Sequence, residues 1–216
     1  MGISFPLKAS TFFDQLGFSS FQMSIPPMME RNETEGGEII SVEHGAQLWS
    51  GSASCRVNPY TDGAETVAIF ETLLRSDASF LAYDKLRPWP QRDAKGLAIA
   101  NKSPKVSPIA GDARGVRLSG FPVGYKMTAG DLLSFKYGSN PTRIALHRVV
   151  STEYADSSGD ILSINVHPPV RPGLANNTAL QLVPATCKAK LVSYEPPSVT
   201  RSRRAEISFS WRQTLR

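Results

Sequence analysis

Four short segments rich in β-branched and aromatic residues lie between residues 116 and 171, and turn-forming clusters separate them. This pattern is typical of a small antiparallel β unit. Short strands joined by turns cannot bury a hydrophobic face by themselves, so the unit should close into a barrel or pack on a second sheet. The four predicted strands are residues 116–118, 132–137, 143–153 and 160–166.

The flanking segments also favour β structure, with a single helix. Val67, Phe70, Leu73 and Leu74 would share one face of a helix over residues 62–75. Residues 39–42 and 47–57 are predicted as two strands joined by a short turn at His44 and Gly45, and 30–38 as a polar loop or arm. Further strands are predicted at residues 3–7, 21–25, 80–83, 179–182, 185–194 and 207–211.

Residues 85–115 differ from both flanks, because they are rich in Pro, Gly and cations and have no sustained period. We interpret them as an extended loop or linker. The predicted fold is therefore mainly β. A β-sandwich or barrel domain with one helix is built from residues 1–84 and 172–216, and a small β-barrel-like unit at 116–171 is inserted into it.

Composition is that of an ordinary soluble globular protein, with 41% apolar and 20% charged residues. The net charge of +5 comes without a long basic stripe, which argues against a dedicated nucleic-acid-binding protein. Cys55 and Cys187 have no metal or redox spacing, so we expect two buried thiols. The first residues lack the features of a signal peptide, and no apolar run is long enough to span a bilayer, so we expect a soluble protein.

No motif indicates catalysis, a metal or a cofactor. His44, His147 and His167 stand outside metal-binding spacings, so a structural role is expected for each. Gly51-Ser-Ala-Ser only partly resembles a nucleophile turn and lies in a predicted strand, and phosphate-binding loops are missing from the sequence. Function should then come from what the β scaffold presents and from what it assembles with.

Three groups of residues are candidate contacts. The apolar N-terminal segment is too rich in large side chains for a free tail, so it should be packed or held by another chain. A basic cluster near the C-terminus could form salt bridges between subunits, although a solvated loop is the simpler interpretation. Aromatic residues of the loop and the inserted unit could contact peripheral partners. The subunit-interface candidates are Phe5, Leu7, Phe12, Phe13, Arg201, Arg203 and Arg204, and the peripheral candidates are Trp89, Tyr125 and Tyr137.

Several motifs together resemble a series found in tail proteins of long-tailed bacteriophages. They are Thr128-Ala-Gly-Asp-Leu-Leu-Ser-Phe, Leu146-His-Arg-Val, residues 156–159, Asn165-Val-His-Pro-Pro-Val-Arg, and the aromatic ending at residues 205–215. The chain is most similar to distal tail proteins, including those of gene transfer agents. The resemblance spans most of the chain, although each motif is short.

The resemblance implies a tail-tube-like β domain with an inserted small barrel. It also implies a ring, commonly a hexamer, that joins the last tail-tube ring to the central hub. The expected partners are further copies of this chain, the tail tube protein, the tail hub protein and tail fibres, with genome DNA only passing through the channel. The expected location is the virion tail tip, after synthesis in the bacterial cytoplasm. The resemblance implies no catalytic residues.

Two alternatives remain open from the sequence. The chain could be another tail component, a hub or tube subunit, and a hub would typically form trimers. It could also be a carbohydrate-binding β module for attachment to a host surface, which would require exposed aromatic side chains at Trp89, Tyr125 or Tyr137.

Overall fold

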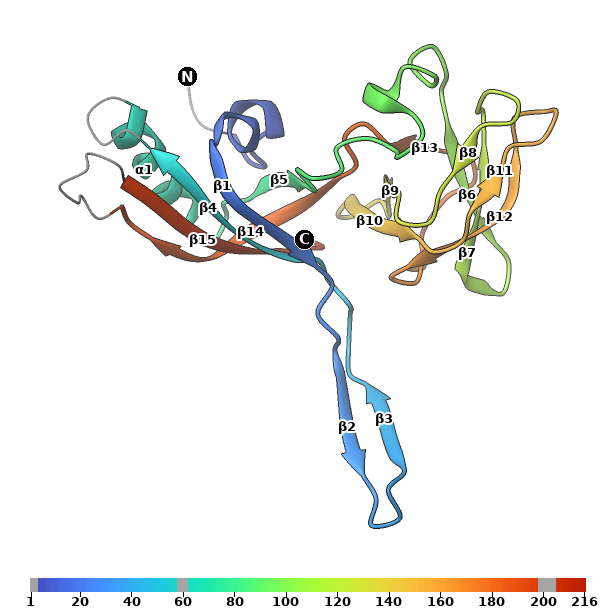
Figure 1. Cartoon of the computed structure of the whole chain (residues 1–216), viewed down its shortest axis with the longest axis horizontal. Helices are drawn as coiled ribbons and strands as arrows, with labels where there is room; N and C mark the ends of the chain where they lie inside the picture. Colours follow the sequence, from blue (N-terminus) through green and yellow to red (C-terminus); the bar gives the residue numbers. More distant parts are fainter. Residues whose placement is uncertain (1–3, 58–61, 198–204) are drawn as a thin grey trace.

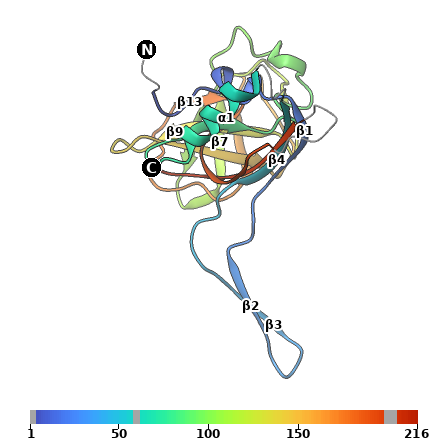
Figure 2. The same cartoon turned by 90° about the vertical axis from the view of Figure 1, so that its left-hand side faces the viewer.

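The computed structural model describes residues 4–57, 62–197 and 205–216. Two bodies lie side by side, an open sheet and a closed barrel, and a two-stranded hairpin projects away from both (Figure 1). The hairpin points away from the bodies in a perpendicular view as well (Figure 2).

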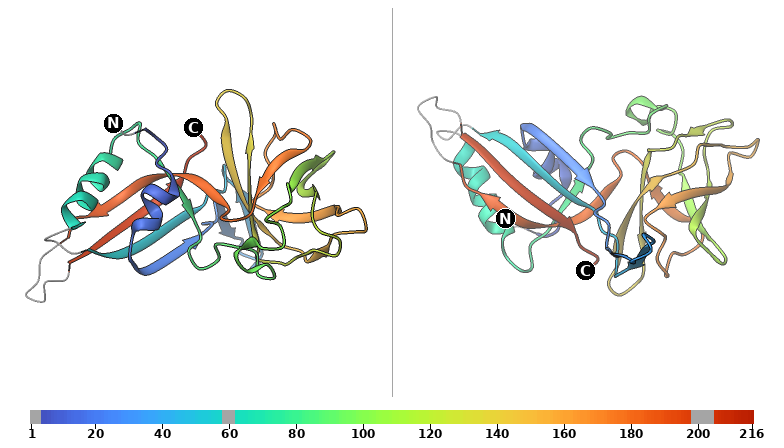
Figure 3. Two further views of the ribbon diagram at one scale, coloured as in Figure 1. Left: turned by 90° about the horizontal axis from the view of Figure 1, so that it is seen from above. Right: turned by 60° about the horizontal axis from the view of Figure 1, so that its bottom comes forward.

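The open sheet has five strands in the order β1-β4-β15-β14-β5, and every neighbouring pair is antiparallel. Its members come from both ends of the chain, as the sequence predicts. One face carries the hydrophobic core, and helix α1 (Asp62–Leu73) lies on that side together with the short helical turns of the N-terminus (Figure 3). The bounds are β1 Phe18–Ser24, β4 Ser50–Val57, β5 Phe80–Tyr83, β14 Thr186–Glu195 and β15 Ala205–Gln213, with 3-10 turns at Ala9–Thr11 and Phe13–Gln15.

The barrel closes through six strands in the order β10-β12-β7-β6-β13-β9. Its interior is filled by branched and aromatic side chains such as Val106, Leu118, Leu133 and Ile164, all essentially inaccessible to solvent. Closure removes the open edges that a small sheet would otherwise expose. The bounds are β6 Lys105–Ile109, β7 Asp112–Ser119, β9 Leu132–Tyr137, β10 Arg143–Val149, β12 Ile161–His167 and β13 Thr178–Gln181, and β8 Lys126–Met127 pairs separately with β11 Glu153–Tyr154.

The predicted fold class is confirmed: the chain is mainly β, with one α-helix and a closed barrel inserted between strands of another sheet. The barrel is wider than the predicted unit at 116–171. Strand β6 and the start of β7 lie in the segment interpreted as a linker, and β13 lies beyond residue 171. Pro108 falls in β6 next to an irregularity in its pairing, so the period-two pattern that marks a strand is interrupted there.

Three local predictions were wrong. No strand forms at the described residues 4–7, where only an isolated bridge at Leu7 is present. The segment at residues 39–42 is a strand, but it pairs with the preceding strand, Met29–Glu33, rather than with the strand that follows it. Leu74 was expected on the buried helical stripe, whereas α1 ends at Leu73 and the Leu74 side chain is exposed. Phe70 and Leu73 are buried as expected.

Gly51 is needed because Trp211 lies directly over it. The two residues are paired across β4 and β15, and a Cβ atom on Gly51 would lie 2.5 Å from two carbons of the Trp211 indole. Trp211 is almost fully buried, so its ring is held by the surrounding core when a side chain is added at Gly51.

Replacing Gly51 with alanine is therefore expected to lower the free energy of unfolding by about 1–3 kcal/mol, the usual cost of overpacking a core. Urea denaturation of the two proteins measures the difference. Gly36→Ala is the matched control, because the nearest atom to its Cβ would be 3.8 Å away, and the expected change there is within about 0.5 kcal/mol. Equal effects at the two positions would contradict the explanation.

Candidate assembly surface

The projecting hairpin, here called the arm, consists of residues 28–45. Strand β2 (Met29–Glu33) pairs with β3 (Ile39–Glu43) in antiparallel register, from Met29 opposite Glu43 to Glu33 opposite Ile39. Its turn is closed by the Thr34 N–H donating to the Glu38 carbonyl at 2.9 Å and the Gly37 N–H donating to the Thr34 carbonyl at 2.8 Å. Gly37 has φ +78°, a backbone conformation that favours glycine.

The surface of the arm is unusual because it carries exposed aliphatic side chains. All five residues of β3 are exposed, with Ile39 at 66% and Ile40 and Val42 at 53% each. A two-stranded hairpin on its own is at best marginally stable in water. The arm therefore has the properties of a segment that is completed by contact with another chain.

The two edges of the five-stranded sheet differ. At the β5 edge, the Leu7 N–H donates to the Ser79 carbonyl at 2.9 Å and the Leu7 carbonyl accepts from the Leu81 N–H at 2.9 Å, so the N-terminal segment covers that edge. At the opposite edge, β1 pairs with β4 on one side, and within residues 4–57, 62–197 and 205–216 no strand pairs with its outer side. An uncovered edge strand is a template for pairing with another chain.

The predicted interface role of Phe12 and Phe13 is wrong. Both rings are buried in the core of the chain itself, where Phe12 meets Phe70 and Phe80 edge-on with ring centres 5.4 and 5.2 Å apart. The segment is anchored by Asp14, whose carboxylate lies 2.7 Å from the Lys85 ammonium. Apolar density in a sequence signals burial, but it does not distinguish the chain's own core from a partner.

The remaining interface candidates have different outcomes. Phe5 and Leu7 are partly buried against the same core, so they are at most partly available to a neighbour. Arg201, Arg203 and Arg204 lie outside the described residues.

The predicted peripheral contacts of Tyr125 and Tyr137 are also wrong. Tyr125 is buried, its ring is 5.0 Å from that of Phe121, and its hydroxyl donates to Asp93 at 3.3 Å. Burial of this hydroxyl, reinforced by the Asp93 charge, raises the pKa of Tyr125. Tyr137 is buried in the barrel. Only Trp89 is exposed, at 41%.

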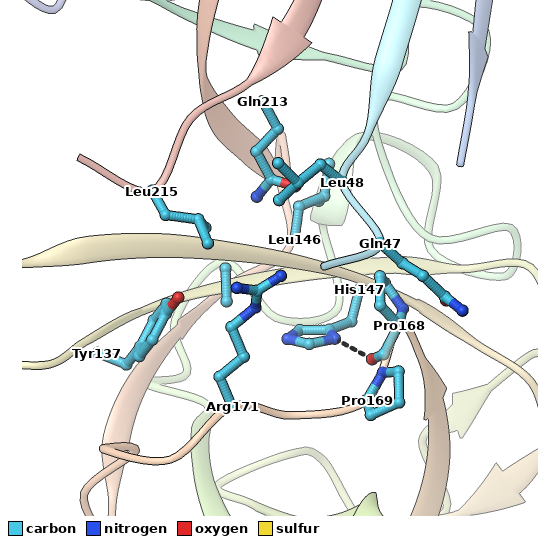
Figure 4. A pocket seen from close by; sticks show the side chains of 11 residues that line it. Gln47, Leu48, Tyr137, Leu146, His147, Pro168, Pro169, Arg171, Gln213 and Leu215 are labelled. Atoms are coloured by element: carbon cyan, nitrogen blue, oxygen red, sulfur yellow. Dashed lines mark hydrogen bonds between the residues drawn. The ribbon is translucent and has the colours of Figure 1, made fainter. Parts of the chain in front are cut away.

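A small cavity lies where the barrel meets the end of β15 (Figure 4). The His147 imidazole lies in its wall, with Nδ1 donating to the Pro168 carbonyl at 2.6 Å and the ring stacked 5.2 Å from Phe135. Burial, with a smaller contribution from the positive charge of Arg171, lowers the pKa of His147 to about 4, although the hydrogen bond to Pro168 acts in the opposite direction. His147 is thus a buried imidazole, neutral at pH 7, that links β10 to the segment after β12.

The junction itself is held by hydrogen bonds between the two bodies. Trp49, immediately before β4, donates its indole N–H to the Leu146 carbonyl of β10 at 2.7 Å. The Gln213 side chain accepts a hydrogen bond from the backbone N–H of Trp49 at 3.2 Å and donates one to the Ile144 carbonyl of β10 at 3.3 Å. Arg143 donates to the Leu215 carbonyl at 3.1 Å. The cavity therefore lies at a structural joint between the open sheet and the barrel.

Side chains capable of metal binding or catalysis are dispersed among the described residues. Within the part of the chain that the structure describes, no three His, Cys, Asp or Glu side chains are grouped as metal ligands would be. The Asp131 carboxylate accepts hydrogen bonds from the backbone N–H groups of Thr128 and Gln91 at 2.8 Å each. Both cysteines are free and buried, which confirms that prediction. Burial raises the pKa of Cys55 to about 11 and also raises that of Cys187.

Among the same described residues, no helix has the length and apolar character to cross a bilayer. The sequence matches no protein-family model, and no curated protein matches it either.

Proposed function

We propose that this chain is a structural protein of a bacteriophage tail tip that assembles into a ring, with six copies as the expected number. The observation that carries the proposal is the arm, a projecting hairpin with exposed Ile39, Ile40 and Val42. The open edge of β1 adds a second surface suited to a neighbouring chain. In a closed ring every copy satisfies the surface of the next, so such features do not lead to open-ended aggregation.

The sequence resemblance to distal tail proteins supports a position for this ring at the tail tip. The ring would join the tail tube to the central hub, with the tail tube protein, the hub protein and tail fibres as partners. Genome DNA would pass through the channel without being a specific ligand. The location would be the virion tail tip.

The alternatives differ in their support. A carbohydrate-binding module would use exposed aromatic platforms, yet Tyr125 and Tyr137 are buried and only Trp89 remains available of the three candidates. A hub or tube subunit shares the same β architecture, so stoichiometry must separate it from a distal ring.

The mass of the purified protein in solution, measured by light scattering with negative-stain images of the same sample, tests the proposal. A hexameric ring with a central hole is the expected result. A trimer would favour a hub. A monomer at every concentration up to about 100 μM, where weak specific contacts are already populated, would contradict self-assembly into a ring.

A further inference from the structure

The arm concentrates negative charge. Residues 28–45 contain Glu30, Glu33, Glu35, Glu38 and Glu43 but only one cation, Arg31, which gives a net charge of −4 on a chain whose total is +5. Of the five carboxylates, Glu30 is paired with His44 at 3.1 Å, and no other ion pair among the described residues involves the arm.

A second segment has the complementary composition. Residues 85–105, here called the basic loop, contain six cations and a single acid, Asp93, which is buried. Lys85 pairs with Asp14, but the other five cations are exposed and take part in none of the ion pairs formed by the described residues. These five are Arg87, Arg92, Lys95, Lys102 and Lys105.

The basic loop also carries exposed apolar side chains. Leu86 and Leu97 are both more than 70% exposed, and Trp89 is partly exposed between two prolines. The arm and the basic loop therefore match in two respects: aliphatic side chains occur on both, and the charges that surround them are opposite in sign. Apolar contact framed by complementary charge is the usual composition of a specific interface.

The arm and the outer turn of the basic loop lie on opposite sides of the molecule. The arm extends downward in Figure 1, whereas the basic loop leaves β5 and rises to a green turn at the top, and the perpendicular view in Figure 2 also shows this turn and the arm on opposite sides. The arm therefore points away from the basic loop of its own chain. Two arms would repel each other because both are acidic, so a symmetric arm-to-arm contact is disfavoured.

We propose that the arm of one copy docks on the basic loop of a second copy of this chain. The contact joins two different surfaces, so it is heterologous and produces head-to-tail assembly, which closes into a ring when the rotation between copies permits. This inference rests on the proposed self-assembly and names the surfaces that form it. Glutamates of the arm lie against cations of the loop, while Ile39, Ile40 and Val42 cover Leu86, Trp89 and Leu97.

A charge-swap experiment tests the pairing. The arm variant carries Glu33→Lys, Glu35→Lys and Glu38→Lys, and the loop variant carries Arg92→Glu, Lys102→Glu and Lys105→Glu. Either variant alone opposes like charges at every contact, so the concentration for half-assembly is expected to rise by roughly 100-fold or more. In an equimolar mixture, every contact between one variant and the other pairs opposite charges, so assembly is expected to return in complexes in which the two variants alternate. Light scattering at low and high salt measures each sample, and salt should weaken assembly of the wild type.

The control variant Glu65→Lys, Glu71→Lys and Glu195→Lys makes the same change in net charge at exposed positions outside the arm, and is expected to assemble like the wild type. Circular dichroism verifies that all variants are folded. If the wild type forms rings and the arm variant forms them equally well, the docking inference is wrong while the proposed function stands. If the variants fail to assemble even when mixed, the inference is also wrong. A wild type that never assembles contradicts both proposals.

Discussion

Replacing Trp49 with alanine is expected to lower the free energy of unfolding by about 3–5 kcal/mol, the range for removing a fully buried aromatic side chain. The Trp49 side chain is inaccessible to solvent and belongs to the core of the open sheet. Its indole N–H donates to the Leu146 carbonyl of the barrel, and the Arg148 guanidinium lies 5.0 Å from the centre of the ring. The substitution therefore removes core volume, a buried hydrogen bond and a cation–π contact at the joint between the two bodies. Chemical denaturation measures the change, with far-UV circular dichroism rather than tryptophan fluorescence as the signal.

Two further variants separate these contributions. Trp49→Phe keeps most of the ring but leaves the Leu146 carbonyl without its indole donor, so a smaller loss of about 1–3 kcal/mol is expected. Trp89→Ala removes an indole that is partly exposed, and is expected to change stability by no more than about 0.5 kcal/mol. Similar losses at positions 49 and 89 would show that Trp49 does not join the sheet to the barrel.

Stability is also expected to fall on the order of 3 kcal/mol as the pH is lowered from 6.5 to 4, because of His147 alone. The pKa of this imidazole is 6.5 when the side chain is exposed in the unfolded chain and about 4 in the folded protein. Between these values the unfolded chain binds a proton that the folded chain does not, so acidification favours unfolding. The contribution is complete above pH 6.5 and is lost by pH 4.

The variant His147→Gln tests this explanation, because its side chain can still donate to the Pro168 carbonyl but does not titrate. Unfolding free energies of both proteins should be measured by urea denaturation at several pH values from 8 to 4. The gap between wild type and variant is expected to change by about 3 kcal/mol over the interval from 6.5 to 4. A gap that stays constant would mean that another group causes the acid sensitivity.

The sequence predicts the central strands of the barrel well because glycine turns separate them. Gly120, Gly130, Gly138 and Gly159 all have positive φ values, and residues of this type are recognisable without a structure. The central strands β9, β10 and β12 are predictable for this reason. Strand β6 was missed because Pro108 interrupts it, and β2 was missed because Met29–Glu33 is polar on both faces and shows no period-two pattern.

The candidate site was predicted less completely. The polar segment at residues 30–38 was recognised as an arm, but its partner strand β3 was assigned to a different hairpin. Phe12, Phe13, Tyr125 and Tyr137 were expected to meet other molecules, and all four are buried within the chain. Composition reveals that an aromatic side chain seeks burial, whereas only the fold determines which surface buries it. Residues 85–115 were interpreted as a loop or linker because they have no sustained period, and their exposed cations become a candidate surface only when the fold shows where they lie.

The two buried thiols have a practical consequence. Nucleophilic attack on a maleimide requires an accessible thiolate, and Cys55 and Cys187 are both buried, with pKa values raised above the ordinary range. The native protein should therefore remain unlabelled near neutral pH under conditions in which a surface cysteine reacts completely. A single cysteine placed on the tip of the arm would then be the sole attachment point for a fluorophore or spin label. Its distance to neighbouring copies could be measured without removing either native cysteine.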